Sequence, residues 1–345
     1  MAAVTEALDV SAVDRWLKSQ VAELRGVPKV TQYSGGASNW TYRLEYENRD
    51  LVLRRPPAGT KAKSAHDMAR EHGIQLALKP HYPVVPTMVA LCQDQAVLGC
   101  DFYVMERIDG LIPRKHLPKE LHLDAAQTRA LCLSVLDRLV ELHRVDFRAA
   151  GLGHLYKGDG YVQRQLSGWT ERYAKARTWN VATFENVTRW LAERAPKDRP
   201  PCVIHNDWRF DNVVLDPREP TRVVGVLDWE LATVGDPLME LGSALAYWVE
   251  AKDGVFMQLG RRQPTHLPGM LTRAEVVEYY LAKTGLSTDD WAFYEVFGLF
   301  RLAGIAQQIY YRYHHGQSRN PAFRFFWVLI NSLAWRCRMV MRRAR

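Results

Sequence analysis

The hydrophobic and polar positions of this chain follow two different periods, one in each part of it. After an amphipathic helix within the first 25 residues, apolar and polar residues alternate. This alternation predicts strands over residues 30–33, 40–46 and 50–55, and a further strand within 97–107. Between the third and fourth strands, a helical period predicts one helix over about 62–78, which a proline-rich loop ends.

From Gly110 onward the period is helical almost throughout. Apolar residues at helical spacing mark a long helix over about 120–145, and a glycine-rich loop follows it. Further helices are expected twice within 166–195, and then over 237–250, 272–285, 288–313 and 321–343. At 345 residues the chain exceeds the usual size of a single core. We therefore predict an α+β fold with a sheet-rich lobe over residues 1–107, a helical lobe over 108–345 and a nucleotide cleft between them.

One short segment of the helical part is predicted to form a β-hairpin, with strands over residues 212–216 and 222–228. The eight residues that lead into it, His205 to Asn212, fit the phosphotransferase pattern H-x-D-x-x-x-x-N. In that pattern Asp207 takes the proton of the acceptor and Asn212 holds a metal ion. A hairpin brings its outer ends together, so Asn212 and Asp228 are predicted to share one Mg²⁺. The alternative is a solvated loop aspartate, a capping asparagine and a turn aspartate.

The composition of the chain restricts its possible binding partners and its location. The 46 basic and 38 acidic side chains give a net charge of +8, which favours anionic partners. No nucleic-acid motif is present, so nucleic acid is an unlikely partner, and no apolar run is long enough for a membrane span. The N-terminus lacks the features of a signal peptide, and the five cysteines are scattered, so we expect a cytoplasmic protein.

Further residues suit a nucleotide site. Ser34, Gly35 and Gly36 join two strands, where backbone N–H groups can approach phosphate oxygens, although a plain turn would look the same. Arg54 shares the face of Val52 and is predicted to point toward the phosphates and to pair with Glu71, although Arg55 and Arg70 lie close enough in sequence to exchange roles with them. Asp236 is predicted to cap the helix that begins at Pro237, and it could also brace the catalytic loop.

These motifs, in this order, resemble the aminoglycoside phosphotransferase and choline kinase group of the protein-kinase-like fold. Residues 53–57 and 102–110 resemble in particular the kinase-like domain that is fused to some acyl-CoA dehydrogenases. The resemblance implies that Asp207 is the catalytic base, that Asn212 and Asp228 bind Mg²⁺, and that His205 braces the loop. It also implies that Glu106 and Ile108 hydrogen-bond the adenine of ATP beside Met105. The wider family has lysine where this chain has Arg54, so the phosphate contact changes in geometry.

The leading hypothesis is therefore an ATP- and Mg²⁺-dependent kinase that phosphorylates a hydroxyl of a small metabolite. The charge excess favours an anionic acceptor, with a hydroxyacyl-CoA as the specific candidate. The alternatives are an aminoglycoside or choline-type phosphotransferase and a nucleotide-binding regulatory pseudokinase. A protein kinase is disfavoured because no Ala-Pro-Glu segment follows Asp228.

Overall fold

The computed structural model describes residues 8–33, 39–57 and 67–344. By its internal contacts the chain divides into two compact units. The first unit contains the chain up to Gly110 together with Val224–Ala232. The second contains Leu111–Val223 and Thr233 onward. No helix in the described part of the chain combines the length and the apolar character that a membrane span needs.

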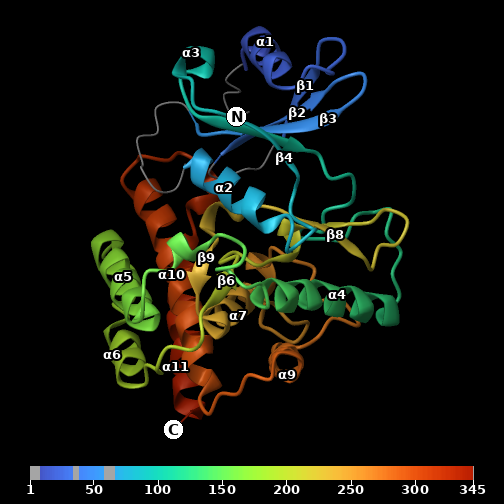
Figure 1. The fold of residues 1–345 in the computed structure, drawn as a ribbon. Helices are drawn as coiled ribbons and strands as arrows, with labels where there is room; N and C mark the ends of the chain where they lie inside the picture. Colours follow the sequence, from blue (N-terminus) through green and yellow to red (C-terminus); the bar gives the residue numbers. More distant parts are fainter. Residues whose placement is uncertain (1–7, 34–38, 58–66, 345) are drawn as a thin grey trace. The chain divides into compact units, whose positions relative to one another are not determined.

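The first unit is built on an antiparallel sheet with the strand order β1-β2-β3-β5-β4 (Figure 1). Its strands are Lys29–Gln32 (β1), Trp40–Glu45 (β2), Asp50–Arg55 (β3), Met88–Cys92 (β4) and Phe102–Glu106 (β5). The helices Val10–Gln20 (α1) and Gln95–Leu98 (α3) lie on one side of the sheet, and Met68–Leu78 (α2) lies on the other (Figure 1).

The alternation along β3 explains this arrangement. Leu51 and Leu53 are buried in the cluster that contains Leu17 of α1. Val52 packs instead with Met68 of α2. Because successive strand residues point to opposite faces, Arg54 lies on the α2 side. Arg54 therefore shares its face of the sheet with Val52 and α2, whereas Leu51, Leu53 and the buried Arg55 lie on the other face.

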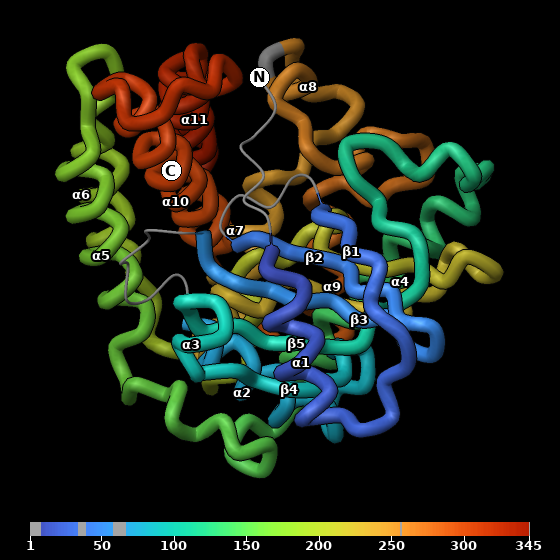
Figure 2. The backbone as a smooth tube through the Cα atoms, turned by 90° about the horizontal axis from the view of Figure 1, so that it is seen from above, coloured from blue at the N-terminus to red at the C-terminus, as the bar shows by residue number. Residues whose placement is uncertain are grey.

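The second unit is mainly helical (Figures 1 and 2). Its helices are Ala125–His143 (α4), Tyr161–Ala176 (α5), Glu185–Glu193 (α6), Pro237–Ala246 (α7), Val255–Gly260 (α8), Arg273–Thr284 (α9), Trp291–His314 (α10) and Phe326–Arg343 (α11). Both views show α5 and α6 beside α10 and α11 (Figures 1 and 2). Cys202–Ile204 (β6) pairs with Thr233–Gly235 (β9). The predicted hairpin is present as Val213–Leu215 (β7) and Val223–Val226 (β8), and β8 from Val224 onward is counted with the first unit.

Several predicted helix ends are wrong by a few residues. The first helix ends at Gln20 rather than near residue 25, because Val21 is extended and Leu24 is buried in the same cluster as Leu17. The helix expected to reach residue 250 ends at Ala246. The short strands β6 and β9 were not predicted, since three residues are too few to display a period.

Two glycines allow α7 and α10 to cross with their backbones in contact. A Cβ atom at Gly298 would lie 2.0 Å from the carbonyl oxygen of Gly242. A Cβ atom at Gly242 would lie 2.3 Å from the carbonyl oxygen of Tyr294. Neither obstacle is a side chain that can rotate away, so the two helices must separate if either glycine is replaced.

We expect Gly298→Ala to destabilise the protein by about 3 kcal/mol or more, because backbone atoms would have to move apart in a packed core. Gly73→Ala on α2 is the matched control, since a Cβ atom there meets nothing within 4 Å. It should be neutral or stabilise by up to about 1 kcal/mol. Urea unfolding followed by circular dichroism would measure both. Equal stability of the two variants would contradict the proposed backbone contact.

Candidate active site

The segment that contains Asp207 begins where β6 ends. His205 is fully buried, and its Nδ1 accepts a hydrogen bond of 3.3 Å from the backbone N–H of Asp207. Asn206 has a φ of 67°, a left-handed conformation that asparagine tolerates better than most residues. This turn carries the chain from the buried strand to Asp207, whose side chain is about one-fifth exposed.

A buried carboxylate on α7 accepts hydrogen bonds from this turn. Glu240 on α7 accepts hydrogen bonds from the backbone N–H groups of His205, at 3.2 Å, and of Asn206. His143 Nε2 lies 2.6 Å from Glu240 Oε2, so the buried acid has a basic partner. The predicted cap is confirmed, because Asp236 accepts hydrogen bonds from the N–H groups of Leu238 and Met239. Asp236 thus anchors the helix, and Glu240 contacts the turn directly.

Glu240 and His143 were not identified from the sequence. A signal existed, because Glu240 is the one charged residue in the mostly apolar stretch 238–246. An acid in a buried helix requires a partner, but its position 35 residues after His205 does not reveal which groups it meets.

The two oxygens of the Asp207 carboxylate differ. Oδ2 accepts a hydrogen bond of 3.2 Å from Asn212 Nδ2, and Arg209 Nη2 lies 3.2 Å away. Asn212 Nδ2 also donates to the backbone oxygen of Asp207 at 2.8 Å. Oδ1 has no such contact among the described residues. One oxygen is therefore held in place while the other can accept a proton, and the amide oxygen of Asn212 is turned away from this contact.

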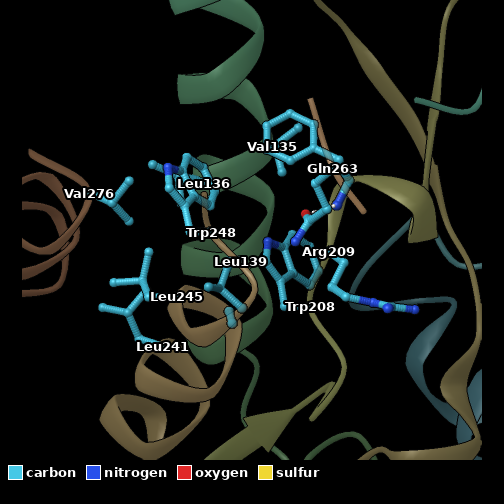
Figure 3. A pocket seen from close by; sticks show the side chains of 12 residues that line it. Val135, Leu136, Leu139, Trp208, Arg209, Leu241, Leu245, Trp248, Gln263 and Val276 are labelled. Atoms are coloured by element: carbon cyan, nitrogen blue, oxygen red, sulfur yellow. Dashed lines mark hydrogen bonds between the residues drawn. The ribbon is translucent and has the colours of Figure 1, made fainter. Parts of the chain in front are cut away.

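Arg209 is a third residue that was not identified from the sequence. Its guanidinium lies over the ring of Tyr247 at 5.3 Å, and its Nε lies 3.3 Å from Asp211 Oδ1. Figure 3 shows Trp208 and Trp248 converging on a small apolar pocket, while the guanidinium of Arg209 points away from it. The pocket has a volume of about 10 Å³, which is too small for a metabolite, so it is not the acceptor site. Its apolar lining packs the loop residues Trp208 and Phe210 against the neighbouring helices.

In the first unit, Arg54 forms the predicted ion pair with Glu71. Its Nη1 lies 2.6 Å from Glu71 Oε1, and its Nη2 lies 3.0 Å from Asp228 Oδ1. Burial alone would lower the pKa of Arg54, but the surrounding negative groups raise it well above its usual value. The planar fork reaches two carboxylates at once, which a lysine ammonium on a single stem does less well. This geometry gives a physical reason for arginine at a position where lysine is the commoner residue.

The neighbouring basic residues have other partners. Arg55 lies on the opposite face of the strand, with its guanidinium 4.8 Å from the ring centroid of Trp40. Arg70 donates to the backbone oxygens of Glu230, at 3.0 Å, and of Ala232. Arg70 therefore links α2 to the segment that follows Asp228. Asp228 itself has a φ of 68°, a left-handed backbone conformation.

The strand β5 leads to the remaining predicted nucleotide contacts. Met105 is buried on the α2 side of the sheet, and Glu106 pairs with Arg49. Ile108 follows the strand, and its N–H makes no backbone hydrogen bond within the described residues. Ser34, Gly35 and Gly36 lie outside the described residues.

Comparisons with known proteins show the family of this chain. A model of the phosphotransferase enzyme family matches residues 29–295. The chain is 33% identical over 333 residues to acyl-CoA dehydrogenase family member 10 of Mus musculus, covering 96% of this chain and 31% of that protein. It is 32% identical over 318 residues to member 11 of Homo sapiens, covering 91% and 40%. The chain thus spans less than half the length of these curated relatives.

Solved structures identify the fold. A candidate aminoglycoside phosphotransferase from Ralstonia eutropha superposes with a TM-score of 0.83 and 29% identity, over 98% of this chain and 100% of that one. A choline kinase from Cryptosporidium parvum has a TM-score of 0.63 over 96% of each chain, and its 12% identity shows the fold alone. The predicted protein-kinase-like fold is confirmed. The chain belongs to the phosphotransferase enzyme family.

Proposed function

We propose that this phosphotransferase is an ATP- and Mg²⁺-dependent kinase that phosphorylates a hydroxyl group of a small anionic metabolite. The observation that carries the proposal is the asymmetric environment of Asp207. Asn212 and Arg209 hold Oδ2, while Oδ1 has no described partner. A carboxylate that is fixed on one side and open on the other suits a residue that orients and deprotonates an alcohol.

Nucleotide binding is assigned to the first unit. Arg54, positioned by Glu71, contacts the phosphates, and its fixed charge opposes the negative charge that develops during transfer. The backbone oxygen of Glu106 and the N–H of Ile108 bind the adenine, and Met105 lines its pocket.

Asn212 and Asp228 are the proposed ligands of Mg²⁺. The donor set fits a hard cation, because it consists of one amide oxygen and one carboxylate. In the described part of the chain no cluster of three or more acidic, histidine or cysteine residues could hold a metal alone. This suits Mg²⁺, which takes most of its ligands from phosphates and water. When bound, the ion neutralises phosphate charge, and Asn212 is kept in orientation by its hydrogen bonds to Asp207.

The acceptor is proposed to be anionic, with a hydroxyacyl-CoA as the specific candidate. The 46 basic against 38 acidic side chains would repel polycationic aminoglycosides and attract the phosphates of coenzyme A. The names of the curated relatives, acyl-CoA dehydrogenase family members 10 and 11, support the same choice. An aminoglycoside acceptor is the alternative, which the name of the Ralstonia structure favours.

A comparative kinase assay tests the acceptor. We expect phosphorylation of 3- or 4-hydroxyacyl-CoA thioesters, with kcat/KM at least about 100-fold above that for kanamycin or choline, because like charges repel the cations from a basic protein. Mass spectrometry of the acceptor would identify the product, and omission of Mg²⁺ is the control. Efficient aminoglycoside phosphorylation without thioester turnover would reject the proposed acceptor and leave the kinase assignment intact.

The choice of Arg54 over its neighbour is also testable. Arg54→Ala is expected to raise the KM for ATP and lower kcat, together reducing kcat/KM by about 100-fold, because a charge-assisted phosphate contact is lost. Glu71→Ala should have a milder effect in the same direction. Arg55→Ala, on the opposite face of the same strand, is the matched control and should change kcat/KM for ATP little. The reverse ranking of the two arginine variants would refute this assignment.

A further inference from the structure

A buried cation lies beside the segment that contains Asp207. Arg301 on α10 is only 6% exposed, and its Nη2 donates a hydrogen bond of 2.8 Å to the backbone oxygen of Asn206. Within the part of the chain that the structure describes, Arg301 forms no salt bridge. An anion bound at this position would supply the counter-ion that this buried guanidinium lacks among the described residues.

A second arginine lies against the same aromatic ring as Arg301. The guanidinium of Arg301 lies 5.5 Å from the ring centroid of Trp169 on α5, and that of Arg172 lies 4.2 Å from the same ring. Gly304, one turn after Arg301, lets the indole approach, because a Cβ atom there would lie 2.9 Å from it. Figures 1 and 2 show the two helices side by side. The packing of α5 on α10 therefore gathers two cations at one indole.

These two charges disfavour each other in the absence of a ligand. Arg172 is an exposed residue, but its guanidinium is partly covered, and this desolvation lowers its pKa. The positive charge of Arg301 lowers the pKa of Arg172 further. Like charges accumulate in this way at sites that bind an ion of opposite charge.

The nearby carboxylates have other partners. Glu240 is engaged by His143, and Glu171 pairs with Lys175 at 2.5 Å. In the described residues neither acid forms an ion pair with Arg301 or Arg172. The charge of Glu171 raises the pKa of Arg172, but its ion pair is with Lys175.

Arg301 lies beside the proposed catalytic base. Arg301 contacts the residue that directly precedes Asp207. The phenol of Tyr247, whose pKa is raised by burial, is also under the influence of the charges of Asp207, Arg301 and Arg209. An anion held by Arg301 would thus lie close to the carboxylate that receives the proton of the acceptor.

We propose that Arg301 and Arg172, at the shared ring of Trp169, form an anion subsite that binds the acceptor through a carboxylate or phosphate group. This inference rests on the proposed function, which it extends by naming the residues that select an anionic acceptor. A guanidinium binds either group through paired hydrogen bonds, and the exposed Arg172 extends the subsite from the buried Arg301 to the surface.

Anion binding can be measured without turnover. Isothermal titration of inorganic phosphate into the full chain, with Mg²⁺ and a non-hydrolysable ATP analogue present, should show a site that Arg301→Gln and Arg172→Gln each weaken by about tenfold or more. Arg189→Gln is the matched control, since it removes the same charge from an exposed position on α6. Phosphate affinities of Arg301→Gln and Arg172→Gln equal to that of Arg189→Gln would overturn the subsite.

Acceptor kinetics separate anion recognition from support of the loop. We expect Arg301→Gln and Arg172→Gln to reduce kcat/KM for anionic acceptors by about 10- to 100-fold, and to reduce kcat/KM for a neutral diol much less. Parallel assays with a hydroxycarboxylate and a hydroxyacyl-CoA show which anion is recognised. Equal losses for neutral and anionic acceptors would mean that Arg301 acts only through Asn206. Failure of the wild-type protein to phosphorylate any acceptor would refute the proposed function but not the phosphate-binding result.

Discussion

Replacing Asp207 with asparagine is expected to reduce phosphoryl transfer by about 10²- to 10⁴-fold while leaving ATP affinity unchanged. Asparagine keeps the size of the side chain and can still accept the hydrogen bond from Asn212, so the loop should retain its shape. What it loses is the oxygen that takes the proton of the acceptor. Steady-state kinetics with the best acceptor and a separate titration of ATP would measure the two effects.

Asp211→Asn is the control for this experiment. It removes the same charge beside the same arginine, because Asp211 Oδ1 lies 3.3 Å from Arg209 Nε. Its effect should stay below about tenfold, the size of an exposed or partly exposed charge interaction. Near-normal transfer by Asp207→Asn, or an equally large loss in Asp211→Asn, would mean that Asp207 is not the base.

Asp228→Asn should also abolish most of the activity, but through a different step. Asparagine tolerates the left-handed conformation at this position, so the backbone is preserved while the charge is lost. We expect weaker binding of Mg²⁺ and ATP together, by about tenfold or more, and a kcat lowered by at least about 100-fold. Titration of Mg²⁺ at fixed ATP would reveal the changed metal dependence.

The loss of Asp228 also removes a partner of Arg54, so a second variant is needed. Glu230→Gln removes another carboxylate near that guanidinium, at 3.7 Å, without touching the proposed metal ligand. It should reduce activity less and leave the Mg²⁺ dependence close to that of the wild type. If Asp228→Asn instead keeps the normal Mg²⁺ dependence, the metal assignment is refuted.

The face on which Arg54 lies was predictable because a strand has a strict period of two. Once Val52 is placed on the α2 side, Arg54 must share that side and Arg55 must take the other. The hairpin after Asn212 was predictable for a similar reason, since its turn and strands are adjacent in sequence. Local geometry determines both features.

Other parts of the site depend on contacts between distant segments. Glu240 meets the loop from a position 35 residues away, and Arg301 meets it from 95 residues away. No local period records which buried charge will contact which backbone group. The same limit explains why Arg209 was missed, because its contact with Tyr247 requires the packing of α7 against the loop.

The glycine crossing of α7 and α10 has a consequence for how this enzyme can diversify. Glu240 and Arg301 both hydrogen-bond the turn before Asp207. Glu240 lies within one helical turn of Gly242 on α7, and Arg301 lies within one helical turn of Gly298 on α10. The separation of their backbones is thus set by direct contact between the two helices, and rearrangement of side chains between the helices cannot alter it. The α5 residues beside Arg301 are under no such constraint, and Arg172 reaches the surface. Under the proposed anion subsite, single substitutions on α5 would change the acceptor preference, while the contact between α7 and α10 would keep the turn before Asp207 in place.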